Sequence, residues 1–128
     1  MAETAWNKLG AYLKETQIIG SIQSALYWDQ NTGMPKKGAS WRSEQLTYIA
    51  KILHKRNSSE EFLDLIKGAQ DEYFRCLKTS WSQELIQTKK RNIELLTKEF
   101  KRQNNLDPKL VESLAKACLL YTSDAADE

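Results

Sequence analysis

The stretch ALYWDQNTGMPKKGA, residues 25–39, separates two helical segments and so decides how the chain folds. Gly33, Pro35 and Gly38 fall within six residues here, and both residue types disfavour a helix interior. We therefore predict a helix over about residues 4–28 and a connection over residues 31–38. A second helix should begin near Ser40 and continue to about residue 55.

Apolar residues recur at helical spacing after this connection and predict further helices. Ser58 and Glu61 form the Ser-x-x-Glu pattern of a capping box, which predicts a short third helix that ends near Gly68. The longest predicted helix, the fourth, covers about residues 71–103. Its main apolar stripe consists of Tyr73, Leu77, Trp81, Leu85, Thr88, Asn92 and Leu95. Ile86, Ile93 and Phe100 widen this stripe, so we expect the helix to contact neighbours on more than one side.

A fifth helix is predicted from Asp107, a good cap, and Pro108, which is favoured at the first helical position. The sequence has no run with the alternating pattern of a strand. Only five Gly and two Pro occur among 128 residues, and this composition also favours helices. We therefore predict an all-α fold of antiparallel helical segments.

Composition and charge are those of an ordinary soluble protein. The chain has 41% hydrophobic residues, a formal net charge of +2 and a mean hydropathy of −0.62. Residues 16–28, the longest uncharged stretch, are too few and too polar for the roughly 20 apolar residues of a membrane span. The amino terminus lacks the basic and apolar regions of a signal peptide, so we expect a cytoplasmic protein with no membrane partner.

Two groups of side chains raise the possibility of nucleic-acid binding. Lys89, Lys90 and Arg91 lie on the fourth predicted helix, but they point in several directions and acidic residues lie among them. We therefore expect a solvated helix and no nucleic-acid partner. The helical positions of the four tryptophans favour packing over a stacking platform. These tryptophans are Trp6, Trp28, Trp41 and Trp81.

Residue types for metal or nucleophilic chemistry are few. A catalytic zinc needs about three protein ligands, and the chain has a single histidine and two cysteines. His54 lies in a basic helix end, where an imidazole can face the terminal carbonyls, so we interpret it as structural. Cys76 lies on a predicted helix without a nearby histidine and is interpreted as a small core residue. We therefore predict no catalytic or metal-binding residue in this chain.

The stretch at residues 25–39 resembles the amino-terminal signature of the carboxypeptidase Taq family of zinc metallocarboxypeptidases. In that signature a Trp-Asp-Gln-x-Thr-x-Met-Pro run precedes a Gly/Ala stretch and a helix with Arg-x-x-Gln-Leu. The matching residues are Trp28, Asp29, Gln30, Thr32, Met34, Pro35, Gly38, Ala39, Glu44, Gln45 and Leu46. Residues 107–115, DPKLVESLA, are similar to a second family pattern, Pro-x-x-Leu-Val-x-x-Leu-Ala. The resemblance covers residues 4–117, although residues 69–90 carry little of the family pattern.

The resemblance implies that the parent protein is a zinc-dependent metallocarboxypeptidase that releases residues from the carboxyl ends of peptides. It implies a larger, all-helical body around a substrate groove, usually as a homodimer. Residues 1–117 would be an incomplete amino-terminal helical region, with Trp28, Asp29 and Gln30 as candidates to approach the groove. The family's His-Glu-x-x-His zinc helix belongs to a later part of a longer chain. We therefore expect this fragment to bind no zinc and to be inactive.

The end of the chain has a different character. Residues 118–128, CLLYTSDAADE, break the charged amphipathic pattern before them and resemble a translated sequencing-library adapter. We interpret them as a non-native tail and expect native sequence to continue past Ala117. The alternative is a stand-alone helical module that binds a partner protein through the exposed faces of the second and fourth predicted helices. A reading frame that stops near Ala117 would favour this alternative.

Overall fold

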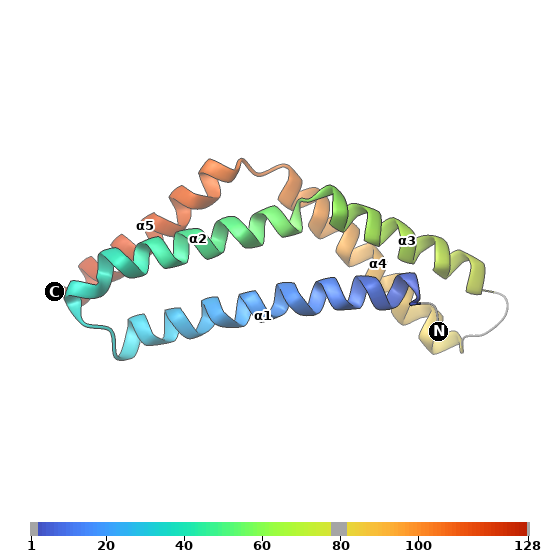
Figure 1. The fold of residues 1–128 in the computed structure, drawn as a ribbon, viewed down its shortest axis with the longest axis horizontal. Coiled ribbons are helices and arrows are strands. Elements are labelled where there is room, and N and C mark those ends of the chain that lie inside the picture. Colours follow the sequence, from blue (N-terminus) through green and yellow to red (C-terminus); the bar gives the residue numbers. More distant parts are fainter. Residues whose placement is uncertain (1–2, 78–81, 128) are drawn as a thin grey trace. The chain divides into compact units, whose positions relative to one another are not determined.

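The computed structural model describes residues 3–77 and 82–127, with side chains of the last helix described through residue 117. The elements, in chain order, are α1 (Ala5–Thr32), the 3-10 helix η1 (Lys36–Gly38), α2 (Ala39–Asn57), α3 (Glu60–Cys76), α4 (Gln83–Asn104) and α5 (Pro108–Asp127) (Figure 1). Every regular element of these residues is helical, so the all-α prediction is confirmed. In this part of the chain, no helix combines the length and the apolar character needed to cross a membrane.

The helices form two compact units. The first unit comprises Met1–Glu15 and Asn57–Asn105, and so contains the first part of α1 together with α3 and α4. The second unit comprises Thr16–Arg56 and Leu106–Glu128, and contains the rest of α1, η1, α2 and α5. Helix α1 therefore contributes residues to both units.

Aromatic rings form the centre of the first unit. The rings of Tyr12 on α1 and Phe62 on α3 stack with centroids 5.4 Å apart and 14° between their planes. Phe100 on α4 is tilted against Phe62 at 6.2 Å. Phe62 is only 1% exposed, so three helices meet around one buried ring. The buried cluster also contains Leu9, Ile66 and Ala69.

Ser59 connects the start of α3 to α1. Its hydroxyl oxygen accepts a hydrogen bond from the backbone N–H of Phe62 at 3.1 Å, and the hydroxyl of Tyr12 lies 3.0 Å from it. The capping box predicted at Ser58 is therefore wrong by one residue. Ser59 takes the cap position, where its hydroxyl serves both the free amide of α3 and the buried tyrosine.

Helix α3 does not end at Gly68 as predicted. Gly68 lies inside the helix without a positive φ angle, and a Cβ built on it would lie 3.6 Å from the Cβ of Ala5 on α1. This is an ordinary contact distance. Gly68 therefore lies where α3 passes α1, and it does not reverse the chain.

The single helix predicted over residues 71–103 is two helices, because α3 ends at Cys76 and α4 begins at Gln83. The hydroxyl oxygen of Ser82 accepts a hydrogen bond from the N–H of Leu85 at 3.3 Å and so caps α4. Apolar spacing continued across this break in the sequence and concealed it. Trp81, which belonged to the predicted stripe, lies outside the described residues.

The buried face of α4 also differs from the predicted stripe. Ile93 is 6% exposed, and Leu96 packs against the core beside Phe100. In contrast, Leu85 and Leu95 from the predicted stripe are 40% and 47% exposed. Ile93 and Phe100, which were predicted only to widen the stripe, therefore face the core, whereas Leu85 and Leu95 of the main stripe are exposed.

In the second unit, α2 runs back along the second part of α1 (Figure 1). Leu46 on α2 is fully buried, and the Nε of Arg56 donates a hydrogen bond to the Thr16 hydroxyl at 3.0 Å. Helix α5 starts as predicted, because the N–H of Lys109 donates to the carboxylate of Asp107 at 2.9 Å. In this unit, the cap of α5 lies where the sequence predicts it, and a side-chain hydrogen bond joins α1 to α2.

Replacing the central ring of the first unit should be costly. We expect Phe62→Ala to lower the free energy of unfolding by about 3–5 kcal/mol, because it removes a fully buried ring and leaves a cavity. Phe74→Ala, on the same helix but 59% exposed, should cost less than about 1 kcal/mol. Urea denaturation followed by circular dichroism measures both values, and Phe62→Leu gives an intermediate point. Equal losses at positions 62 and 74 would contradict the packing described.

Candidate functional site

The signature stretch forms the end of α1 and the turn into η1. The backbone N–H groups of Gly33 and Met34 both donate to the carbonyl oxygen of Asp29, each at 2.9 Å. The hydroxyl of Thr32 donates to the carbonyl oxygen of Trp28 at 2.6 Å. These bonds close the last turn of α1, which extends to Thr32 and so past its predicted end at Trp28.

Arg42 on α2 connects this helix end to the next helix. Its Nη2 donates to the Oδ2 of Asp29 at 2.6 Å, and its Nη1 donates to the carbonyl oxygen of Leu26 at 2.6 Å. Its Nε donates to the Oε1 of Gln45 at 3.0 Å. The Arg42 side chain is 12% exposed, so the guanidinium group is held by three acceptors in a mostly buried position.

The three predicted site residues have different surroundings. Asp29 is engaged by Arg42, although its side chain is still 53% exposed. Trp28 is 72% exposed. The side-chain oxygen of Gln30 is buried and has no hydrogen-bond partner among the described residues. Adjacent positions in the sequence thus supply one helix-to-helix contact, one exposed ring and one buried polar atom.

Arg42 is the residue that the sequence analysis did not single out. The signal was present, because Arg42 and Gln45 are the first and fourth residues of the Arg-x-x-Gln-Leu pattern. Residues three apart lie on one face of a helix, which allows Nε of Arg42 to reach Gln45. The pairing with Asp29, thirteen residues earlier, depends on how α2 turns back along α1 and has no local signal.

The prediction that the tryptophans pack is wrong for two of them. Trp28 at the end of α1 and Trp41 at the start of α2 are 72% and 67% exposed. Helical spacing alone does not say which face of a helix meets a neighbour. Trp6 is half-buried and lies under the ammonium group of Lys89, 4.4 Å from the ring centroid.

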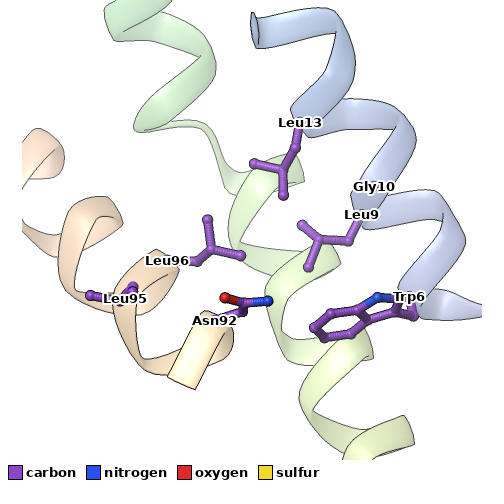
Figure 2. A pocket seen from close by; sticks show the side chains of 7 residues that line it. All are labelled: Trp6, Leu9, Gly10, Leu13, Asn92, Leu95 and Leu96. Atoms are coloured by element: carbon purple, nitrogen blue, oxygen red, sulfur yellow. The ribbon is translucent and has the colours of Figure 1, made fainter. Parts of the chain in front are cut away.

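The first unit has an apolar hollow between α1 and α4, of about 310 Å³. Figure 2 shows Leu96 and Asn92 of α4 projecting toward Leu9 and Trp6 of α1. We call it the α1–α4 hollow. It is lined by Trp6, Leu9, Gly10, Leu13, Asn92, Leu95 and Leu96.

The described residues do not fit a metal centre. Within residues 3–77 and 82–117, no three His, Cys, Asp or Glu side chains are grouped closely enough to hold a metal ion. His54 is buried in the last turn of α2, and Cys76 is half-buried at the end of α3 and so is not a core residue.

Charged side chains on α4 form a surface network. Hydrogen bonds from Gln103 and then Arg102 lower the pKa of Glu99 below its usual value. Arg102 is 69% exposed, so this pair faces water. The network stabilises the carboxylate form of Glu99.

Comparison with known proteins supports the motif match. The family model that matches the chain describes the carboxypeptidase Taq (M32) metallopeptidases and covers residues 8–123. The chain is 33% identical over 70 residues to Thermostable carboxypeptidase 1 of Thermus thermophilus. This similarity covers 52% of the chain and 14% of the length of that relative. No solved structure matches. The interpretation of residues 118–128 as a non-native tail stays a prediction.

The contacts of Arg42 give a testable order of stabilities. We expect Arg42→Ala to lower the free energy of unfolding by about 2–3 kcal/mol, because it frees a carboxylate and two other acceptors at once. Asp29→Ala should cost no more than about 1 kcal/mol, since its carboxylate is half exposed.

The control is Arg102→Ala, which removes an exposed pair with Glu99 of similar length, 2.8 Å. Its effect should stay below about 1 kcal/mol in the same urea titration. If Arg42→Ala and Arg102→Ala cost the same, Arg42 does not hold the helix junction.

Proposed function

The chain belongs to the carboxypeptidase Taq (M32) metallopeptidase family, and from this premise we propose that it is the amino-terminal helical part of a zinc-dependent metallocarboxypeptidase. The whole protein would release residues from the carboxyl ends of peptides. The observation that carries this proposal is the family match over residues 8–123. The Trp28–Pro35 run and the helices on both sides of it support the same assignment.

Zinc, in this proposal, is bound by residues of the parent protein outside this chain. Support comes from the metallopeptidase family itself and from the lack of a suitable ligand group among the described residues. The matched region is 14% of the length of the Thermus relative, which leaves most of such a protein to supply the ligands. We also propose peptide substrates, a homodimer and a cytoplasmic location for the parent.

Of the three candidate groove residues, we propose Trp28 for contact with substrate, and Asp29 and Gln30 for positioning. Trp28 has most of its ring free to meet a ligand, whereas the side-chain oxygen of Gln30 is buried and so is not exposed to one. The carboxylate of Asp29 is already bound by Arg42. Asp29 would therefore act by holding the end of α1 against α2.

The native gene provides the first test. We expect its reading frame to continue past Ala117 and to encode a His-Glu-x-x-His helix, in which two histidines one turn apart can share a zinc ion. The full-length protein should release carboxyl-terminal residues from peptides, and chelation should abolish this activity. The 128-residue chain alone should show neither activity nor one-to-one zinc binding. A frame that ends near Ala117, or a long frame without the zinc helix, would refute the proposal.

The role of Trp28 can be tested in the full-length protein. We expect Trp28→Ala to lower kcat/KM at least about tenfold, which corresponds to about 1.4 kcal/mol of lost transition-state binding. Trp41→Ala is the matched control, because Trp41 is similarly exposed on the neighbouring helix. It should leave kcat/KM within twofold, and neither variant should change the melting temperature appreciably. Equal effects of the two substitutions would place Trp28 outside the groove.

A further inference from the structure

The α1–α4 hollow leads from solvent to the core of the first unit. Leu9 belongs both to the buried cluster and to the lining of the hollow, and it is 1% exposed. At the rim, Leu95 is 47% exposed. An apolar surface of this kind, continuous with a core, is costly to leave in water and commonly marks a binding surface.

The α1 side of the hollow is open at Gly10 and is bordered by Trp6. A Cβ built on Gly10 would meet no atom within 4 Å, so the α1 side is open where a larger residue would project. On the same side, the backbone N–H of Trp6 donates to the carboxylate of Glu72 on α3 at 2.8 Å. Lys89 covers the Trp6 ring at 4.4 Å. The first contact anchors the backbone of Trp6 to α3, and the second places a cation against the indole ring that lines the hollow.

We propose that the α1–α4 hollow is the docking groove for an amphipathic helix from the part of the parent protein outside residues 1–117. This inference rests on the proposed function, because it requires a longer parent chain. The matched region is 14% of the length of the Thermus relative, so most of such a chain lies outside the structure. Its apolar side chains would complete the core that Leu9 begins.

The lining gives the chemistry of the docking helix. Two helices border the hollow, and a third helix can lay apolar residues at i, i+3 or i+4, and i+7 between them. Among the mostly apolar lining residues, Asn92 carries an amide group. A hydrogen bond from this amide to one polar residue would set the register of the docking helix. We therefore expect an apolar face with a single hydrogen-bonding residue.

Thiol labelling at Asn92 tests whether the hollow is covered. Asn92→Cys should react freely in the 128-residue chain, and at least tenfold more slowly in the full-length protein. Lys90→Cys is the control, because Lys90 is exposed and lies on the other side of α4. It should react at rates within twofold in both proteins. Mass spectrometry of the labelled peptides separates these sites from other cysteines.

A second variant tests whether the docking helix occupies the hollow beside Gly10. Gly10→Leu fills the hollow, so in the full-length protein it should displace the docking helix and raise the labelling rate at position 92 at least fivefold. The matched control is Gly20→Leu, on the same helix and also free of neighbours within 4 Å but outside the hollow. It should leave labelling at position 92 unchanged.

Equal labelling at position 92 in the short chain and the full-length protein would overturn the inference. Protection that appears in the short chain and grows with its concentration would also overturn it, because the occupant would then be a second copy. Carboxypeptidase activity of the same full-length sample is read separately. Activity without protection overturns this inference alone, whereas protection without activity overturns the proposed function alone.

Discussion

The balance of buried and exposed apolar surface constrains everything else in this chain. Among the described residues, eight hydrophobic side chains are buried, whereas eleven large ones remain exposed. Burial of apolar surface must offset the conformational entropy that each helix loses on folding, and a small core buries little surface to do so. The stability of each unit therefore depends strongly on its few buried contacts. The exposed leucine and tryptophan side chains are free to pack against other surfaces.

Two polar residues show how these small units are held. Ser59 caps α3 and meets the hydroxyl of Tyr12 in the first unit, and Arg42 joins α2 to the end of α1 in the second. Each of these side chains forms hydrogen bonds both to backbone at a helix end and to a side chain of a neighbouring helix. A polar group with two structural tasks of this kind compensates for limited apolar burial, because it orders a helix end and an interhelical contact together.

Sequence patterns predicted the helices well where the deciding chemistry was local. Asp107 begins α5 through a contact two residues away, which a pattern can capture. Prediction was wrong where distant contacts decided. Ser59, and not Ser58, is the cap that also contacts Tyr12 of α1, and Gly68 stays helical where α3 passes α1. The break between α3 and α4 was hidden because apolar spacing continued across it.

The residues of the signature stretch have structural roles in the turn between α1 and α2. Its residues identified the family, yet in the structure Asp29 bonds to Arg42 and closes α1 through its carbonyl oxygen. Both tasks belong to a helix junction. A motif can therefore be specific for a family because the turn demands those residues, without any of them touching substrate. The exposed ring of Trp28 is the part of the stretch that the junction leaves free to meet another molecule.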